Sequence, residues 1–350
     1  MPAIGFPGQL PAGWIARRLG YKGGIMAGLA LGMAASVVLT GFFNAAWPTL
    51  AMGVVTGVLS ATAMSWHGIL LAEEIVRAVA CADQVRFVSS GTEADFYAMR
   101  LARAFRGREK ILKFEGPHTV AAIIVETVVG TNGILIPPDG YMQGLREICD
   151  RHGILLIADE VMAGFGRTGK WFAIDHWGVV PDLITMAKGL TSAYVQLGAL
   201  GMRRKIADHF ADKVFGAGLT YNSHPLACAT ALATIGVYEE DGLIERAAES
   251  GKKLRAHHER MKAKHPCVGP IRNIGLFGII ELVRDPKRGE PIAGFNQTVP
   301  EMVALGKFFR ENGLYTIVRW NGFFTNPPLN ISDAELDFAF DVIDRGLAEV

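Results

Sequence analysis

Hydrophobic and polar positions divide this chain of 350 residues into two parts with different patterns. No Asp, Glu, Lys or Arg occurs between Lys22 and Glu73. Within this part, the apolar stretches 23–43 and 48–72 are each long enough to cross a hydrocarbon core, which takes about 20 residues. From residue 73 onward, short apolar runs alternate with amphipathic stretches. The change of pattern predicts a domain boundary between residues 72 and 73.

The first part has features of a membrane-spanning helical hairpin. Gly24, Gly28 and Gly32 recur every four residues, a spacing that lets helices approach closely in a membrane. Basic residues within 17–22 precede the first stretch, which favours a cytoplasmic N-terminus. A hairpin over 23–72 would then tether the chain to the cytoplasmic face of the membrane and leave the rest in the cytoplasm. The alternative is a buried, glycine-rich helical pair in a soluble core, because this glycine spacing alone is a weak signal.

The second part has the alternation expected of an α/β domain. Helical patterns at 93–105 and 142–153 lie between apolar runs that are short enough to be buried strands. These predicted strands cover residues 85–90, 110–114, 121–126, 154–159 and 182–187. Such alternation predicts a mostly parallel sheet covered by helices.

A smaller α+β domain is expected at the C-terminal end. Residues 237–264 read as a charged helical connector, and Ser332 to Glu335 form a capping-box sequence ahead of an amphipathic helix. We therefore expect a large domain over residues 73–236, followed by a small domain over 237–350.

Three groups with complementary chemistry stand at the carboxyl ends of predicted strands, where α/β folds bind ligands. Asp159 closes the run ILLIAD, and Lys188 follows the apolar run DLITMA. The small residues of SSGTEA (89–94) open a helix, whose N-terminal N–H groups can bind a phosphate. An amine, a carboxylate and a phosphate site together fit pyridoxal 5'-phosphate. Each group alone has a structural alternative: a helix cap, an ion pair, or a lysine whose amine reaches water.

Composition excludes several other classes of function. Lys plus Arg (35) nearly equal Asp plus Glu (34), so no general attraction to nucleic acid is expected. The four cysteines form no CxxC pair and the nine histidines include no HExxH, so no metal site is predicted. Reduced thiols and a cytoplasmic location are the default for such scattered cysteines.

LLIADEVMAGFGRTGKW, PDLITMAKGL and SSGTEADFYAMRLARAF together resemble the signature of class III pyridoxal-phosphate aminotransferases, of fold type I. The resemblance covers about residues 71–350. Within it, IRNIGLFGIIELV and YTIVRWNGFFTNPPL look most similar to omega-amino-acid:pyruvate and taurine:pyruvate transaminases. The resemblance implies that Lys188 forms the Schiff base and acts as general base, which requires a desolvated amine of lowered pKa. It also implies that Asp159 pairs with the pyridinium nitrogen and that Val161 packs on one face of the ring.

The same resemblance implies a phosphate site and a homodimer. Ser90, Gly91 and Thr92 would hold the cofactor phosphate, and Thr220 of GLTYNS would reach it from the partner subunit. The substrates would be an amine or amino acid and a keto acid.

Two further positions are implied for substrate binding. Arg319 in IVRW would grip a substrate carboxylate, for which a planar guanidinium is well suited. Glu126 matches the position that pairs with a switching arginine in many relatives. The structural alternatives are a rim carboxylate for Glu126 and an ion pair at a strand edge for Arg319.

The chain departs from the family pattern at two places. The phrase PGQLPAGWIARRLGYKGGI, where relatives carry a segment folded against the dimer partner, loosely resembles a loop of major-facilitator transporters. In KILKFEGPHTVAAIIVE, only residues 115–120 separate two predicted strands, whereas a parallel crossover takes roughly a dozen residues or more. These strands therefore form an antiparallel hairpin, or the sheet is incomplete and lacks a family strand and a ring-stacking aromatic residue.

Three hypotheses follow. The first is a transaminase that transfers an amino group to pyruvate, with a related aminomutase or decarboxylase as a competitor. The second is a shortened chain that keeps the fold but does not hold the cofactor. The third is a membrane-anchored protein whose function lies in residues 1–72.

Overall fold

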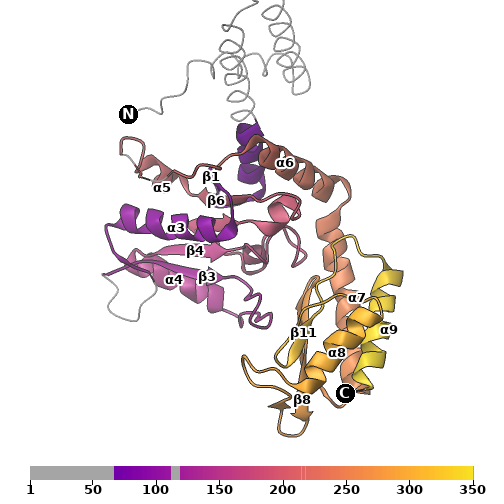
Figure 1. The fold of residues 1–350 in the computed structure, drawn as a ribbon. Helices are drawn as coiled ribbons and strands as arrows, with labels where there is room; N and C mark the ends of the chain where they lie inside the picture. The colour runs from indigo at the N-terminus through magenta and orange to yellow at the C-terminus, as the bar shows by residue number, and fades with distance from the viewer. Residues whose placement is uncertain (1–66, 112–118, 214, 217, 350) are drawn as a thin grey trace, which may run out of the picture.

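The computed structural model describes residues 67–111, 119–213, 215–216 and 218–349. These residues form a large α/β domain and a smaller domain, connected through two long helices (Figure 1). The predicted membrane stretch 23–43, and all of 48–72 except its last six residues, lie outside the described part of the chain.

The large domain is built on a six-stranded sheet with the order β1-β6-β5-β4-β3-β2. Its strands are β1 (Gln84–Val88), β2 (Lys110–Ile111), β3 (Val120–Glu126), β4 (Leu155–Asp159), β5 (Leu183–Met186) and β6 (Gly198–Met202). Strands β2 to β5 run parallel, whereas β6 is antiparallel to both of its neighbours. The prediction of a mostly parallel sheet is confirmed.

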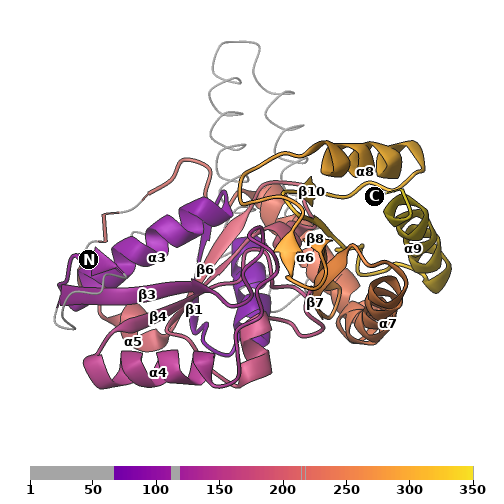
Figure 2. The same cartoon turned by 90° about the horizontal axis from the view of Figure 1, so that it is seen from below.

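Helices cover both faces of this sheet (Figure 2). The alternating residues Leu155 and Ile157 face α3 (Gly91–Arg106), and Leu156 and Ala158 share the opposite core with α4 (Tyr141–His152). Side chains of a strand alternate between faces, so a strand of continuous apolar residues is buried on both sides. This is why the predicted strands read as unbroken apolar runs.

The connection between β2 and β3 differs from the antiparallel hairpin considered as one prediction. The two strands pair in parallel, with Lys110 opposite Val120 and Ile111 opposite Ala122. Strand β2 is only two residues long, and the rest of the predicted strand 110–114 lies outside the described residues. The hairpin prediction is therefore wrong.

The predicted connector 237–264 is two helices rather than one. Helix α6 (Pro225–Glu240) ends at Asp241, and α7 (Leu243–Lys264) starts after Gly242, whose φ of 58° suits glycine. The expected boundary between residues 236 and 237 falls within α6.

The small domain consists of a second, antiparallel sheet with helices packed against it. Its main sheet has the order β10-β11-β8-β7, and β9 pairs with β8. The strands are β7 (Val268–Ile274), β8 (Phe277–Asp285), β9 (Glu290–Pro291), β10 (Val318–Arg319) and β11 (Gly322–Phe324). Helices α8 (Pro300–Glu311) and α9 (Asp333–Leu347) complete it, and the predicted capping box of Ser332 and Glu335 is present at the start of α9.

Residues 67–78 form one helix, and the expected boundary between residues 72 and 73 falls within it. Leu71 and Ile75 are 0% and 1% exposed and belong to the core of the large domain. The last residues of the second predicted membrane stretch thus pack inside the protein. No helix within the described residues is long and apolar enough to span a membrane.

Candidate active site

The carboxyl ends of three parallel strands bring the candidate residues together. Glu126 on β3 lies opposite Asp159 on β4, and Asp159 lies opposite Thr185 on β5. Residues paired in register on neighbouring strands point to the same face of the sheet. Glu126, Asp159 and Thr185 therefore line one edge on the face covered by α3, and Lys188 follows three residues after Thr185.

Lys188 occupies a tight turn beyond the end of β5. The run Leu183–Ala187 is buried, as expected, but the side chain of Lys188 is exposed. The backbone turns at Lys188 with a φ of 41°, which directs the side chain past the sheet edge instead of into the core. The prediction of a desolvated amine is therefore not met in this structure.

The N-terminus of α3 packs directly against the elements that carry the other two groups. Ser90 caps α3 by accepting a hydrogen bond from the Glu93 N–H. A Cβ atom added at Gly91 would lie 2.7 Å from Val161 Cγ1 and 3.3 Å from Ala187 Cβ. Val161 is two residues after Asp159, and Ala187 immediately precedes Lys188. Gly91 thus lets the helix N-terminus, the carboxylate and the lysine converge.

Asp159 is partly buried, and its surroundings shift its pKa in opposite directions. Desolvation raises the pKa of Asp159, and the charge of Glu126 adds to this effect. The Val161 N–H donates a hydrogen bond to Asp159 Oδ1 at 2.9 Å, and both this bond and the ammonium of Lys188 lower the pKa of Asp159. The lysine and the carboxylate therefore lie close enough to interact electrostatically.

Asp95 is a member of this cluster that sequence reasoning missed. Thr185 Oγ1 donates a hydrogen bond to Asp95 Oδ1 at 2.6 Å. Desolvation, followed by the charge of Asp159, raises the pKa of Asp95 to about 6. Its sequence signal is its position four residues after Gly91 in α3, which places both on the helix face that covers the sheet.

Glu160 follows Asp159 in the sequence and is fully buried. Its carboxylate accepts hydrogen bonds from Thr127 Oγ1 and from the N–H groups of Ala173 and Ile174, at 2.7 to 2.9 Å. Burial raises its pKa to about 7. These bonds tie the ends of β3 and β4 to the short helix η2 (Ala173–Trp177).

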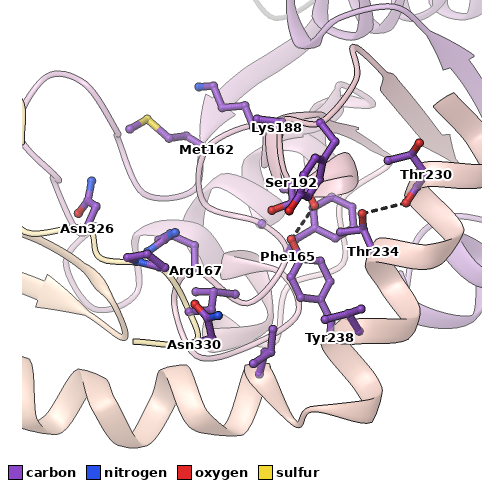
Figure 3. Close-up of a pocket in the computed structure, with 18 of the residues that line it drawn as sticks. Met162, Phe165, Arg167, Lys188, Ser192, Thr230, Thr234, Tyr238, Asn326 and Asn330 are labelled. Atoms are coloured by element: carbon purple, nitrogen blue, oxygen red, sulfur yellow. Dashed lines mark hydrogen bonds between the residues drawn. The ribbon is translucent and has the colours of Figure 1, made fainter. Parts of the chain in front are cut away.

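A cavity of about 640 Å³ separates the two domains next to Lys188 (Figure 3). The amine of Lys188 extends toward Met162, and Asn326 and Asn330 approach from the small domain. Arg167 lies between Asn326 and Asn330 in Figure 3, and its guanidinium donates hydrogen bonds to the carbonyl groups of Leu276 and Pro327.

Three predicted site residues are exposed. Thr92 lies in the first turn of α3, and Thr220 lies on the segment that precedes α6. Arg319 on β10 is exposed in the small domain, where its guanidinium stacks 4.6 Å from the centre of the Trp320 ring. No contact brings Thr220 or Arg319 to Lys188 among the described residues.

Comparison with known proteins decides the family. Residues 115–347 match the family model described as aminotransferase class III. The chain belongs to the class III aminotransferase family. The omega-aminotransferase of Caulobacter vibrioides is 43% identical to this class III aminotransferase over 249 residues, which are 69% of this chain and 54% of the relative. A taurine–pyruvate aminotransferase of Bilophila wadsworthia is 40% identical over 191 residues, 53% of this chain and 42% of the relative.

Solved structures of transaminases share the fold of this class III aminotransferase. The taurine:2-oxoglutarate aminotransferase of Bifidobacterium kashiwanohense, solved in complex with PLP and glutamate, superposes with a TM-score of 0.79 at 31% identity. The match covers 81% of this chain and 79% of that structure. By contrast, the chain spans about half the length of the curated relatives it matches.

Proposed function

We propose that this chain is a pyridoxal-phosphate-dependent transaminase that transfers an amino group from an omega-amino acid or amine to pyruvate. The main support is the close approach of Gly91 to both Val161 and Ala187, which brings the N-terminus of α3 next to the segments that carry Asp159 and Lys188. The named activities of the omega-amino and taurine relatives support the substrate class.

The residues present fit the cofactor. The N–H groups at the start of α3 suit a phosphate, since a helix N-terminus is partially positive. Asp159 offers a hydrogen-bond acceptor that is close enough to the Lys188 ammonium for the two charges to interact. When bound, pyridoxal phosphate supplies an aldehyde that captures amines and a ring that accepts electrons.

The roles of this chain's residues follow from their chemistry. Lys188 would hold the cofactor and take up the proton that leaves the amine-bearing carbon of the substrate, because its exposed amine reaches the cavity. Asp159 would keep the ring nitrogen protonated. Arg319 would bind a substrate carboxylate, Glu126 would pair with a switching arginine, and Thr220 would complete the phosphate site across a homodimer.

The test uses the full chain incubated with pyridoxal phosphate and treated with borohydride. We expect a visible absorption band that borohydride bleaches and a mass label on Lys188. Lys188→Ala should abolish both, and Asp159→Asn should keep the label but lower amino transfer by two or more orders of magnitude. A wild-type protein that stays colourless in excess cofactor would contradict the proposal.

The amino acceptor identifies the reaction. Turnover that requires pyruvate supports the proposed transaminase, and a preference for 2-oxoglutarate would follow the acceptor named for the Bifidobacterium enzyme. Turnover without any keto acid would instead indicate an aminomutase or decarboxylase.

One observation favours a catalytically impaired chain as the second candidate. The Lys188 side chain is exposed, whereas a reactive lysine is expected to be desolvated. Failure to label Lys188, in a protein that unfolds cooperatively, would favour this candidate.

A further inference from the structure

The turn that carries Lys188 is conformationally strained. Lys188, Ser192 and Ala193 have φ values of 41°, 49° and 62°, in the left-handed region that residues other than glycine avoid. Such a conformation persists only where surrounding contacts hold it. The neighbours of this turn therefore decide how the lysine is presented.

Tyr238 holds the turn from the side opposite to the amine. Its hydroxyl, which comes from α6, donates a hydrogen bond to the Gly189 carbonyl at 2.6 Å. Figure 3 shows this bond below the turn, while the amine of Lys188 points away from it toward Met162. Tyr238 is only 7% exposed, and burial raises its pKa, so the hydroxyl stays protonated as a donor.

Phe165 fixes the ring of Tyr238 and closes the other side of Gly189. The two rings stack with centres 6.2 Å apart and an interplanar angle of 27°. A Cβ atom added at Gly189 would lie 2.8 Å from Phe165 Cβ. Gly189 is thus held between a hydrogen bond and a packed side chain.

The Gly189 carbonyl also accepts a hydrogen bond from the Ser192 N–H at 3.2 Å. That donor belongs to the strained turn itself. Loss of the Tyr238 hydroxyl would therefore remove the bond that links the turn to the rigid helix α6.

We propose that Tyr238 is a positioning residue for Lys188, acting through the Gly189 carbonyl. This inference rests on the proposed role of Lys188. It assigns Tyr238 no contact with the reacting atoms. What Tyr238 provides is a fixed direction for the lysine amine, so that the capture of a bound aldehyde is favoured.

The experiment compares Tyr238→Phe with wild type, using two cofactor forms. Pyridoxal phosphate can bond to Lys188, whereas pyridoxamine phosphate lacks the aldehyde and binds without that bond. Stopped-flow absorbance at saturating pyridoxal phosphate gives the first-order rate of bond formation. We expect this rate to fall about two- to tenfold, the effect of one hydrogen bond, with pyridoxamine phosphate affinity unchanged.

Tyr315→Phe is the matched control, because Tyr315 is 87% exposed in the small domain. It should leave both measurements at wild-type values. Phe165→Leu keeps the Tyr238 hydroxyl but removes the aromatic ring that stacks on Tyr238. It should slow bond formation at Lys188 about two- to fivefold. This variant supplies the test should Tyr238→Phe not fold.

The outcomes separate the two proposals. A wild-type chain that forms no bond at Lys188 refutes the proposed function and, with it, this inference. A wild-type chain that does, with Tyr238→Phe matching its rate, overturns the inference alone. Equal weakening of both cofactor forms would assign Tyr238 a purely structural role and also overturn it.

Discussion

Glu160 and Asp159 are neighbours in the sequence, yet their carboxylates have different surroundings. Consecutive residues at a strand end point to opposite faces of the sheet. Asp159 faces α3 and interacts with the charges of Glu126 and Lys188. Glu160 is fully buried and satisfied by three donors. One carboxylate is thus available to a ligand, and the other fixes the backbone beside it.

Replacement of Glu160 tests this structural role. Glu160→Ala leaves the hydroxyl of Thr127 and the N–H groups of Ala173 and Ile174 without an acceptor. The free energy of unfolding should fall by about 3–5 kcal/mol. Urea unfolding checks this. Glu160→Gln keeps one acceptor oxygen and should lose less, and an alanine variant within 1 kcal/mol of wild type would refute the assignment.

Asp95 gives a pH prediction. The groups that face it are Thr185, Asp159, Glu126 and Lys188. Because its pKa is raised from 3.8 to about 6 on folding, the folded protein binds this proton more tightly than the unfolded chain. Its stabilising contribution is full below about pH 4 and is lost as the pH rises through about 6.

Asp95→Asn removes this titration but keeps an oxygen for Thr185. Relative to this variant, wild type should lose thermal stability between pH 4 and pH 7. Melting curves of both proteins across this range measure the difference, and parallel curves would show that Asp95 does not titrate as inferred.

Helix α3 is the element that assembles the site, through its first residue. The close approach of Gly91 to Val161 leaves no room for a side chain there. Helix α4 presents the opposite case, because nothing lies within 4 Å of a Cβ added at Gly144. The two glycines are thus a matched pair within helices on opposite faces of one sheet.

Alanine substitution distinguishes them. Gly91→Ala should lower the free energy of unfolding by about 1–3 kcal/mol through overpacking, and it should weaken phosphate binding. Gly144→Ala should raise the same free energy by about 0.5–1 kcal/mol, since alanine favours the helix. Urea unfolding and pyridoxamine phosphate titration check both, and similar effects of the two variants would disprove the packing argument.

The sequence pattern predicted the helices and strands that have a clear apolar pattern. Strand β4 and helix α3 were predicted close to their observed ends. Strand β6 was missed because GALGM carries two glycines, which weaken a strand pattern. In the structure, a Cβ at Gly201 would lie 2.8 Å from both Ala82 and Ile184, so close packing requires glycine there.

The same was true of the site residues: those next to an apolar run were predicted, and the others were missed. Lys188 and Asp159 were predicted because they end apolar runs, whereas the roles of Asp95 and Glu160 depend on partners distant in the sequence. Thr185 is 90 residues from Asp95, and no local pattern reports that contact. The exposure of Lys188 was missed because the turn at its φ of 41° is a tertiary feature.

At the scale of the molecule, close backbone contacts join helix α7 to the small-domain turn at Gly275, and that turn to the large domain. A Cβ added at Gly251 on α7 would lie 2.6 Å from the Gly275 Cα, and one added at Gly275 would lie 2.4 Å from the Thr168 carbonyl carbon. Arg167 extends this contact through the Leu276 and Pro327 carbonyls. The GFGRTG loop (residues 164–169) of the large domain thus lies against the backbone of the small domain. The approach is so close that a side chain at Gly275 would not fit.

Gly251→Ala should therefore loosen the small domain. Backbone atoms cannot move aside cheaply, so we expect a loss of about 1–3 kcal/mol in the free energy of unfolding. Hydrogen exchange in α7 should rise along with it. Gly236→Ala in α6, where nothing lies within 4 Å of the added Cβ, is the control, and equal exchange in both variants would contradict the close packing of α7 against Gly275.

The passage of the chain from the large to the small domain gives the two domains a fixed order of synthesis. In the described residues the chain passes from the large to the small domain at Asp241 and Gly242. Arg167 consequently leaves the ribosome on the order of ten seconds before Pro327, whose carbonyl it will contact. During that interval the nascent large domain presents a hydrated guanidinium on its surface, which only the arrival of the last third of the polypeptide can cover.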